Sequence, residues 1–363
     1  MSFQFNLRIY SAAAALLVVS VATVTPNARA AAGNTSFAFL KMVQSPRSSA
    51  MGNAGAADMA DPLGGSFLNP GILGRCAWEE FYSSYGSFWN QMSFTQAAYA
   101  HPLMSGAFDA EVHYLKYDAI SAFDNNDNQI GSFQPSSLLA ATSWGREITR
   151  GVAVGVRLKF IREDLGPVAA TAKAADVGFV HDVLAVRGLS WGFSVRNLGT
   201  SGSFDGDKTK LPLETDLGAA YSVFSERLKL TVDEVEDKDV GGAKYRVGSE
   251  YWIRDLIALR CGYQSKQGVG SGVSAGIGFK LSSRFRLDYA YAPFGDLGTT
   301  HRFAVSWRFG GGKAQALYRE GLRKLREENY SQAVLLFDQV LTLDPDNVAA
   351  AQGLREATSK MKP

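Results

Sequence analysis

One pentapeptide has the spacing of a serine-hydrolase nucleophile. Residues 272–276 read Gly-Val-Ser-Ala-Gly, and this pattern works only where the serine lies on a strained strand-to-helix turn beside a histidine and an acid. Here the pentapeptide lies inside a run that alternates apolar and polar residues, with Val273, Ile277 and Phe279 on one face. We therefore expect small residues on the inner face of a strand and no hydrolase chemistry.

The other candidates for chemistry are spread too widely to form a site. No two of the four histidines have the i, i+4 spacing of a zinc-binding helix: His101, His113, His181 and His301. Residues 268–270 (Gly-Val-Gly) precede no helix, so we expect a turn and not a phosphate loop. The acids are scattered, and the acidic stretch 233–239 is expected to be a solvated loop, with a cation or partner site as the alternative. No catalytic residue, cofactor-binding residue or metal ligand is predicted, and the protein is expected not to be an enzyme.

The composition and the N-terminus restrict the class of protein. The chain has 363 residues and a net charge of +2, with no clustered basic face that would indicate nucleic-acid binding. Arg8, the apolar run 11–24 and the small residues at 28 and 30 predict a signal peptide over residues 1–30. Cys76 and Cys261 are the only cysteines, so no disulfide framework is expected, although a single bridge between them remains possible.

Residues 76–309 repeat one pattern, a run of about ten residues that alternate between apolar and polar, followed by a turn of Gly, Asn, Asp or Pro. The runs approach the ~9–11 residues that a tilted strand needs to cross a bilayer, and aromatic residues recur near their ends. The opposite face of each run holds charged, hydroxyl and glycine residues, which suits a wet or polar lumen. We therefore predict an all-β transmembrane barrel of about 14 antiparallel strands, with a secreted β-sandwich or propeller as the alternative. The expected strand starts are residues 77, 92, 107, 134, 150, 172, 188, 212, 226, 243, 255, 270, 283 and 300.

The segments on either side of the barrel have different patterns. Residues 31–75 do not alternate and are rich in Ala, Gly and Met, so they are expected to form a plug in the barrel mouth, or else a disordered lead-in. Residues 310–313 read as a glycine linker, and residues 314–363 as a small helical domain. Six residues of this domain have the spacing of a 34-residue tetratricopeptide (TPR) repeat, although a generic helical hairpin could match by chance: Leu317, Gly321, Tyr330, Ala333, Phe337 and Pro345.

Several stretches resemble the PorV/PorQ family of outer-membrane proteins. They include residues 45–54, the tripeptide Asn69, Pro70 and Gly71, and residues 251–263. The longest matching string ends the barrel region and contains Pro293, Phe294, Gly295, Asp296, His301 and Arg302. The resemblance implies a fourteen-strand barrel similar to the FadL transporters, with an N-terminal plug, and implies for some members a part in type IX secretion. The chain departs from the family where Asn-Pro-Ala-Gly-Leu reads Asn-Pro-Gly-Ile-Leu over residues 69–73, and in its helical tail.

The leading functional hypothesis is therefore a non-enzymatic barrel of the bacterial outer membrane that takes part in protein export or assembly. Its expected partners are membrane lipid, the barrel-assembly machinery that reads the aromatic last strand, and a protein bound by the periplasmic helical tail. The alternative is a FadL-like transporter that admits hydrophobic small molecules past the plug. An apolar pocket lined by the plug and by inner strand faces would favour transport, whereas a lumen that is polar throughout would favour export.

Overall fold

The computed structural model describes residues 36–42, 45–88, 91–200, 203–204, 207–208, 210–237, 242–265, 270–310, 312–344 and 347–361. The expected signal peptide, Pro345 of the repeat pattern, and most of residues 268–270 lie outside these ranges. No helix in the described residues is long and apolar enough to cross a membrane.

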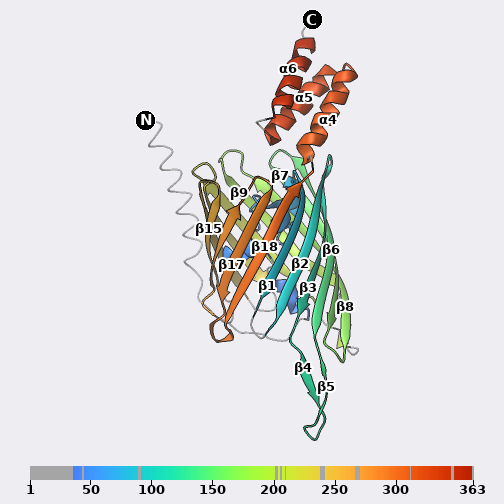
Figure 1. Ribbon diagram of the computed structural model, residues 1–363, viewed down its shortest axis with the longest axis vertical. Helices are drawn as coiled ribbons and strands as arrows, with labels where there is room; N and C mark the ends of the chain where they lie inside the picture. Colours follow the sequence, from blue (N-terminus) through green and yellow to red (C-terminus); the bar gives the residue numbers. More distant parts are fainter. Residues whose placement is uncertain are drawn as a thin grey trace.

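Fourteen antiparallel strands form a closed barrel, as the sequence predicts (Figure 1). Each begins within three residues of its expected start. The last strand pairs with the first, from Glu79 opposite Phe309 to Ser87 opposite His301, so the barrel has no free edge. The barrel strands are β1 (Glu79–Ser87), β2 (Ser93–Leu103), β3 (Gly106–Lys116), β6 (Ser136–Thr149), β7 (Val152–Asp164), β8 (Ala169–Asp182), β9 (Leu189–Thr200), β12 (Glu214–Val223), β13 (Leu228–Asp237), β14 (Ala243–Ile253), β15 (Ile257–Gln264), β16 (Val273–Lys280), β17 (Phe285–Pro293) and β18 (Thr299–Phe309).

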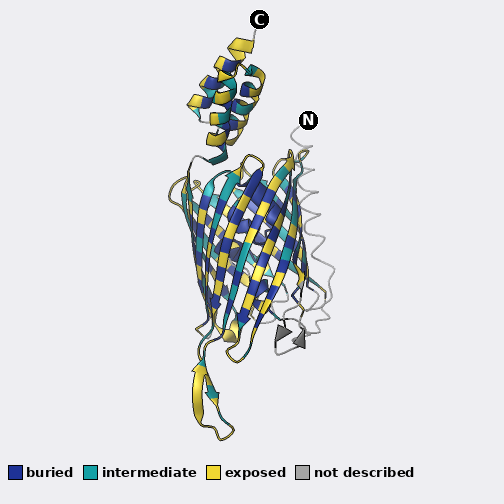
Figure 2. Ribbon diagram, turned by 90° about the vertical axis from the view of Figure 1, so that its right-hand side faces the viewer, coloured by how far each residue is buried: buried dark blue, intermediate teal, exposed yellow. Residues whose placement is uncertain are grey.

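Exposure alternates along most of the length of the wall strands, because successive side chains of a strand point to opposite faces (Figure 2). In β7 the exposed face carries Val156, Leu158 and Phe160, and the buried face carries Arg157 and Lys159. A wall that is apolar on its outer face and polar on its inner face is typical of a membrane barrel. The inner face is polar, as expected, and the N-terminal segment fills the middle of the lumen and shields these charges from solvent.

Four short helical elements lie inside the barrel and run across its lumen. Proline starts three of them, at positions where the fixed φ of proline suits the first turn of a helix. We call these elements, together with the described residues that connect them, the plug: η1 (Ala38–Lys41), α2 (Pro46–Ala50), α3 (Pro62–Ser66) and η2 (Pro70–Arg75).

The two ends of the barrel differ. At one end, which we call the hairpin end, β4 (Ile120–Phe123) and β5 (Gln129–Phe133) project beyond the wall strands, and the short pair β10 (Ser203–Phe204) and β11 (Asp207–Lys208) joins β9 to β12. At this end η3 (Gly295–Leu297) also lies between β17 and β18. At the other end, which we call the helix end, the connections are short turns and the chain leaves the barrel through three helices.

Those helices are α4 (Gly312–Arg326), α5 (Tyr330–Leu343) and α6 (Val348–Met361), and they form a small helical domain as predicted. Phe337 is fully buried at its centre, and the backbones of Gly321 and Gly353 approach the aromatic ring so closely that a Cβ would lie within 2.8 Å of it. Of the repeat-pattern residues, Leu317, Gly321, Ala333 and Phe337 are buried here, while Tyr330 starts α5 and is half-buried.

Candidate functional site

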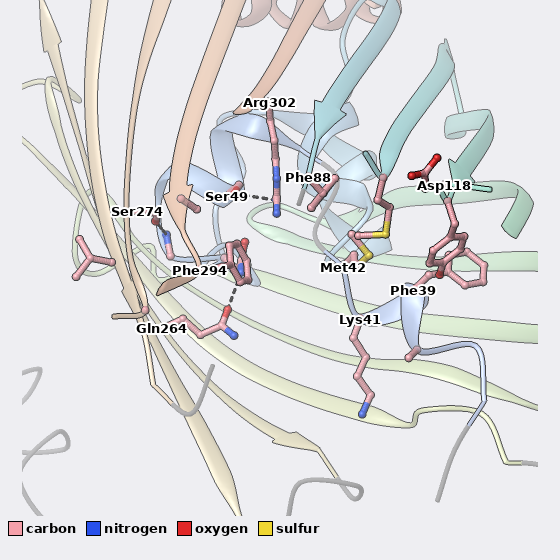
Figure 3. Close-up of a pocket in the computed structure, with 18 of the residues that line it drawn as sticks. Phe39, Lys41, Met42, Ser49, Phe88, Asp118, Gln264, Ser274, Phe294 and Arg302 are labelled. Atoms are coloured by element: carbon pink, nitrogen blue, oxygen red, sulfur yellow. Dashed lines mark hydrogen bonds between the residues drawn. The ribbon is translucent and has the colours of Figure 1, made fainter. Parts of the chain in front are cut away.

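A cavity of about 840 Å³ opens at the hairpin end, between η1 of the plug and the ends of the wall strands (Figure 3). Its apolar walls come from the plug and from the turns at this end of the barrel. They include Phe39, Met42, Phe88, Met92, Ile120 and Phe294. The volume suits a small molecule, since ligand pockets usually measure about 300–1,000 Å³.

Polar groups at the cavity hold the plug to the wall. Arg302 donates from Nη1 to Ser49 Oγ at 2.8 Å, and Asn53 donates from Nδ2 to Gln264 Oε1 at 2.6 Å. On the η1 side, the Lys41 ammonium lies 3.0 Å from the Asp237 carboxylate. The cavity is therefore an apolar space with a few placed polar groups, which is the usual character of a ligand pocket.

An apolar cluster adjoins the cavity within the lumen. Phe37, Phe39 and Leu40 of the plug segment pack against inward-facing residues of β2, β3, β6 and β7. The inward-facing members are Phe94, Leu115, Leu139 and Ile161. The lumen is thus not polar throughout, because beside β2, β3, β6 and β7 both the plug and the wall are apolar near the hairpin end.

Deeper in the lumen, the plug and the wall are joined by one continuous chain of ion pairs. We call it the latch: Lys229, Asp58, Arg47, Glu250, Arg260, Asp288, Arg286 and Asp61, in order of contact. Cations and carboxylates alternate along it, four of each, so no member is left as an unpaired buried charge. Arg47 of α2 is the central contact, with Nη1 at 2.6 Å from Asp58 Oδ2 and Nη2 at 2.8 Å from Glu250 Oε1.

The electrostatics of the plug residues agree with this pairing. Burial by itself raises the pKa of Asp58. The nearby cations of Arg47 and Lys229 lower this pKa by a larger amount, so that it falls to about 2. Burial likewise lowers the pKa of Arg47, whereas Asp58 and Glu250 raise it, and the net result is well above the usual value. Asp58 and Arg47 are therefore both charged at physiological pH.

A second ionic set lies on the opposite side of the lumen, where Arg157 pairs with Glu111 and also lies over the ring of Phe67. Lys159 lies 2.6 Å from Asp176, and Arg196 lies 3.0 Å from Glu214. The barrel's acids are scattered in the sequence, but the inward face of successive strands brings them together with cations.

The plug backbone rests on inward-facing glycines of the wall. A Cβ at Gly262 would lie 2.0 Å from the backbone nitrogen of Gly52, and a Cβ at Gly155 would lie 2.2 Å from the carbonyl oxygen of Pro70. Both distances are far below van der Waals contact, so only glycine allows the plug to approach the wall at these positions.

The signature tripeptide of the plug lies at this contact. Asn69 donates from Nδ2 to the carbonyl oxygens of Ala56 and Phe179, and its Oδ1 accepts from Gly71 N–H. Pro70 and Gly71 lie against the wall glycines. The tripeptide therefore fixes the path of the plug along β8.

The signature string near the last strand divides between two faces. Phe294 and Arg302 line the cavity, and Pro293 ends β17 opposite Thr299. Gly295 and Asp296 form the exposed η3 turn. His301 accepts or donates at Nδ1 with the Tyr289 hydroxyl at 2.8 Å, on the outer face with Phe303 and Trp307.

The residues that reasoning from the sequence missed are the inward-facing charges and glycines. Asp233 and Asp237 belong to β13 and point into the lumen, so the expected solvated loop at residues 233–239 is wrong for its described part. The apolar alternation of the outer face stops at Val232, because the next outward positions are Glu234 and Glu236 while Val235 faces inward, so the pattern gave no signal that the strand continues.

The remaining candidates show no chemistry. Within the described residues, no group of His, Cys, Asp or Glu has the geometry of a metal site. Cys76 and Cys261 are both free, and burial raises the pKa of the Cys76 thiol to about 12. Ser274 is the second residue of β16, where it accepts from Gly52 N–H, so the hydrolase-like pentapeptide belongs to the plug contact.

Comparison with known proteins supports the fold. No protein-family model matches the chain, and no curated protein matches it in sequence. Among solved structures, it is similar to the toluene transporter TbuX of Ralstonia pickettii, with a TM-score of 0.55 and 16% identity over 73% of this chain and 98% of that one. The toluene transporter TodX of Pseudomonas putida gives a TM-score of 0.53 at 13% identity, over 73% and 98% of the two chains. A FadL homologue of Pseudomonas aeruginosa gives 0.51 at 10% identity, over 74% and 98%. These neighbours are outer-membrane barrels of the FadL type, and the identities are low enough that the likeness concerns the fold.

Proposed function

We propose that the protein is an outer-membrane transporter that admits small hydrophobic molecules from its hairpin end. The observation that carries the proposal is the apolar cavity of about 840 Å³ between η1 and the wall strands, which continues into an apolar cluster inside the lumen. Two of the similar structures are themselves toluene transporters. Docking of an exported protein on the barrel would not require an apolar space inside the barrel, whereas entry of a hydrophobic molecule does.

The proposed orientation follows from the ends of the barrel. Membrane barrels of this class have short turns in the periplasm and longer loops outside, so the hairpin end would face outward and the three helices would lie in the periplasm. The hydrophobic molecule then enters at the cavity and must pass the plug. Lipid contacts the apolar outer face, and the aromatic strand β18 is the segment that the assembly machinery would read.

A part in protein export, as in the PorV/PorQ family, is the second candidate. It is favoured by the helical domain, which is an addition to the barrel, and by the projecting pair β4 and β5. The TPR-like character of the helices supports a protein partner, since one such unit buries little apolar surface by itself. In this case the exposed arginines of α4, Arg319, Arg323 and Arg326, would be the first residues to test for partner contact.

The proposal is tested by entry of a hydrophobic dye into intact cells. N-phenyl-1-naphthylamine fluoresces once it reaches the membrane interior, so the initial rate of fluorescence increase reports entry. Ala292→Trp fills the cavity from an inward-facing position of β17, whereas Ala97→Trp places the same side chain on the outward face of β2. We expect Ala292→Trp to reduce entry to the rate of cells without the protein, and Ala97→Trp to retain it. Equal entry through both variants, at equal amounts of folded protein, would contradict transport through this cavity.

A further inference from the structure

The turns at the helix end share a feature that the proposed transport does not use. Five of the six turns there carry one exposed arginine each, in the order Arg150, Arg187, Arg227, Arg254 and Arg284. In the described part of the chain, none of these five side chains forms an ion pair. The barrel therefore presents a ring of free guanidinium groups at this rim.

One of these arginines borders a cavity of about 660 Å³ on the outside of the rim. The cavity lies between the turn that joins β8 to β9 and the turn that joins β12 to β13. It is lined by Arg187, Tyr221, Val223 and Phe224, with Glu226 at its edge. It is thus a mostly aromatic and aliphatic pocket with one cation and one carboxylate at the rim.

Phe224 exposes its aromatic ring at this pocket, since its side chain is 73% exposed. Phe224, Ser225 and Glu226 have φ angles of 52°, 55° and 68°, which is the left-handed backbone that tight β-hairpin turns use. The turn therefore holds the ring at the edge of the apolar pocket, where a ligand in the pocket would cover it.

The pocket continues the outer wall of the barrel. Tyr221 pairs in register with Leu230 of β13 and with Leu189 of β9, so all three lie on the outward face. Leu230 is exposed on that face. A hydrocarbon chain lying along these side chains would therefore reach the pocket without leaving the apolar surface.

We propose that this pocket binds one anionic phospholipid of the adjoining leaflet, with its phosphate on Arg187 and an acyl chain over Phe224 and Tyr221. Continuity with the lipid-facing wall identifies the occupant as a lipid, and the unpaired guanidinium selects a negative headgroup. Glu226 suits a headgroup that carries hydroxyl groups and a single negative charge, as phosphatidylglycerol does. The inference rests on the membrane orientation of the proposed function, which places this rim at the inner leaflet.

The test uses the purified full chain and native mass spectrometry. The protein is titrated with phosphatidylglycerol in detergent, and the fraction carrying one lipid gives an affinity. Arg187→Gln should weaken binding about fivefold, the factor expected for one arginine at an anionic lipid surface, and Phe224→Ala should weaken it at least as much. The matched controls are Arg150→Gln, another arginine of the rim outside this pocket, and Leu256→Ala, an exposed apolar residue of another turn; both should bind as the parent chain does.

Three outcomes would overturn the inference. The first is unchanged binding in both pocket variants, and the second is equal affinity for phosphatidylcholine, which would mean that the headgroup charge is not read. The third is a preference for lipid A over phosphatidylglycerol, which would assign this rim to the outer leaflet. Dye entry is measured in the same variants. Normal dye entry in Arg187→Gln together with unchanged lipid binding would refute the lipid site alone and leave the transport proposal standing.

Discussion

Replacing Arg47 tests whether charge holds the plug in the lumen. Arg47 is 4% exposed and bridges Asp58 of the plug to Glu250 of β14. In Arg47→Leu, both carboxylates lose their central partner, and each keeps one cation, Lys229 or Arg260. Breaking a buried ion pair in this way costs about 3–5 kcal/mol.

The free energy lost in Arg47→Leu should destabilise the seated position of the plug and leave the fold of the barrel wall unchanged. The fourteen-strand ladder contains no bond to Arg47, so the wall is expected to stay closed and folded. A loss of ~4 kcal/mol shifts the equilibrium between seated and displaced plug by roughly a thousandfold, at ~1.4 kcal/mol per factor of ten. Single-channel recording in planar bilayers should therefore show frequent open events in Arg47→Leu and rare ones in the parent chain.

The control variant removes an ion pair of the same type from the surface. Arg323 pairs with Glu320 and Glu327 on α4, and its side chain is 58% exposed. Arg323→Leu should leave conductance unchanged, because exposed pairs contribute ~0–1 kcal/mol. If Arg47→Leu stays closed, the reasoning is refuted, and packing on the wall glycines would be what holds the plug.

Four further outcomes are expected. Gly262→Val should displace the plug, because a Cβ there would lie 2.0 Å from backbone, whereas Gly131→Val meets nothing within 4 Å; conductance and heat-modifiable gel mobility compare the two. Leu230→Arg should lower the stability of the barrel in vesicles by about 2–4 kcal/mol if the residue lies near the bilayer midplane, and a normal unfolding midpoint would mean that the outer face is misassigned. Because the pKa of Asp58 is lowered to about 2, the stabilisation of the seated plug by the Asp58 carboxylate is complete above about pH 4 and is lost as the pH falls toward 2. Channel opening between pH 7 and 5 would contradict this. A single cysteine at Lys360 in a chain without other cysteines should resist an impermeant thiol reagent in intact cells and react after permeabilisation, and labelling of intact cells would place the helices outside.

The sequence predicts the wall of the barrel much better than its contents. Alternation decides which way each side chain points, so the strands and their two faces follow from local pattern alone. It does not decide which partner an inward side chain meets. Arg157 and Glu111 are 46 positions apart in sequence, and they pair only because β3, β6 and β7 are neighbours with a particular register.

The same limit explains the weak pattern that β3 shows in the sequence. Asp109 and Glu111 interrupt an apolar run there, which reads as a poor membrane strand. In the structure both face inward: Asp109 accepts from Ser66 of the plug, and Glu111 pairs with Arg157. A charge on the lumen face is tolerated where a plug residue or another strand neutralises it, and that partner cannot be identified from the strand itself.

The two sides of α2 face different parts of the molecule. Ser49 and the residues after the helix, Gly52 and Asn53, line the cavity at the hairpin end. Arg47, two positions before Ser49, points toward the helix end and forms the centre of the latch. Both sites include residues of α2, so a displacement of this helix changes the cavity and the latch together. A molecule that binds the cavity more tightly when α2 is displaced must weaken the latch by the same free energy, and a weakened latch must raise the affinity for that molecule by the same factor.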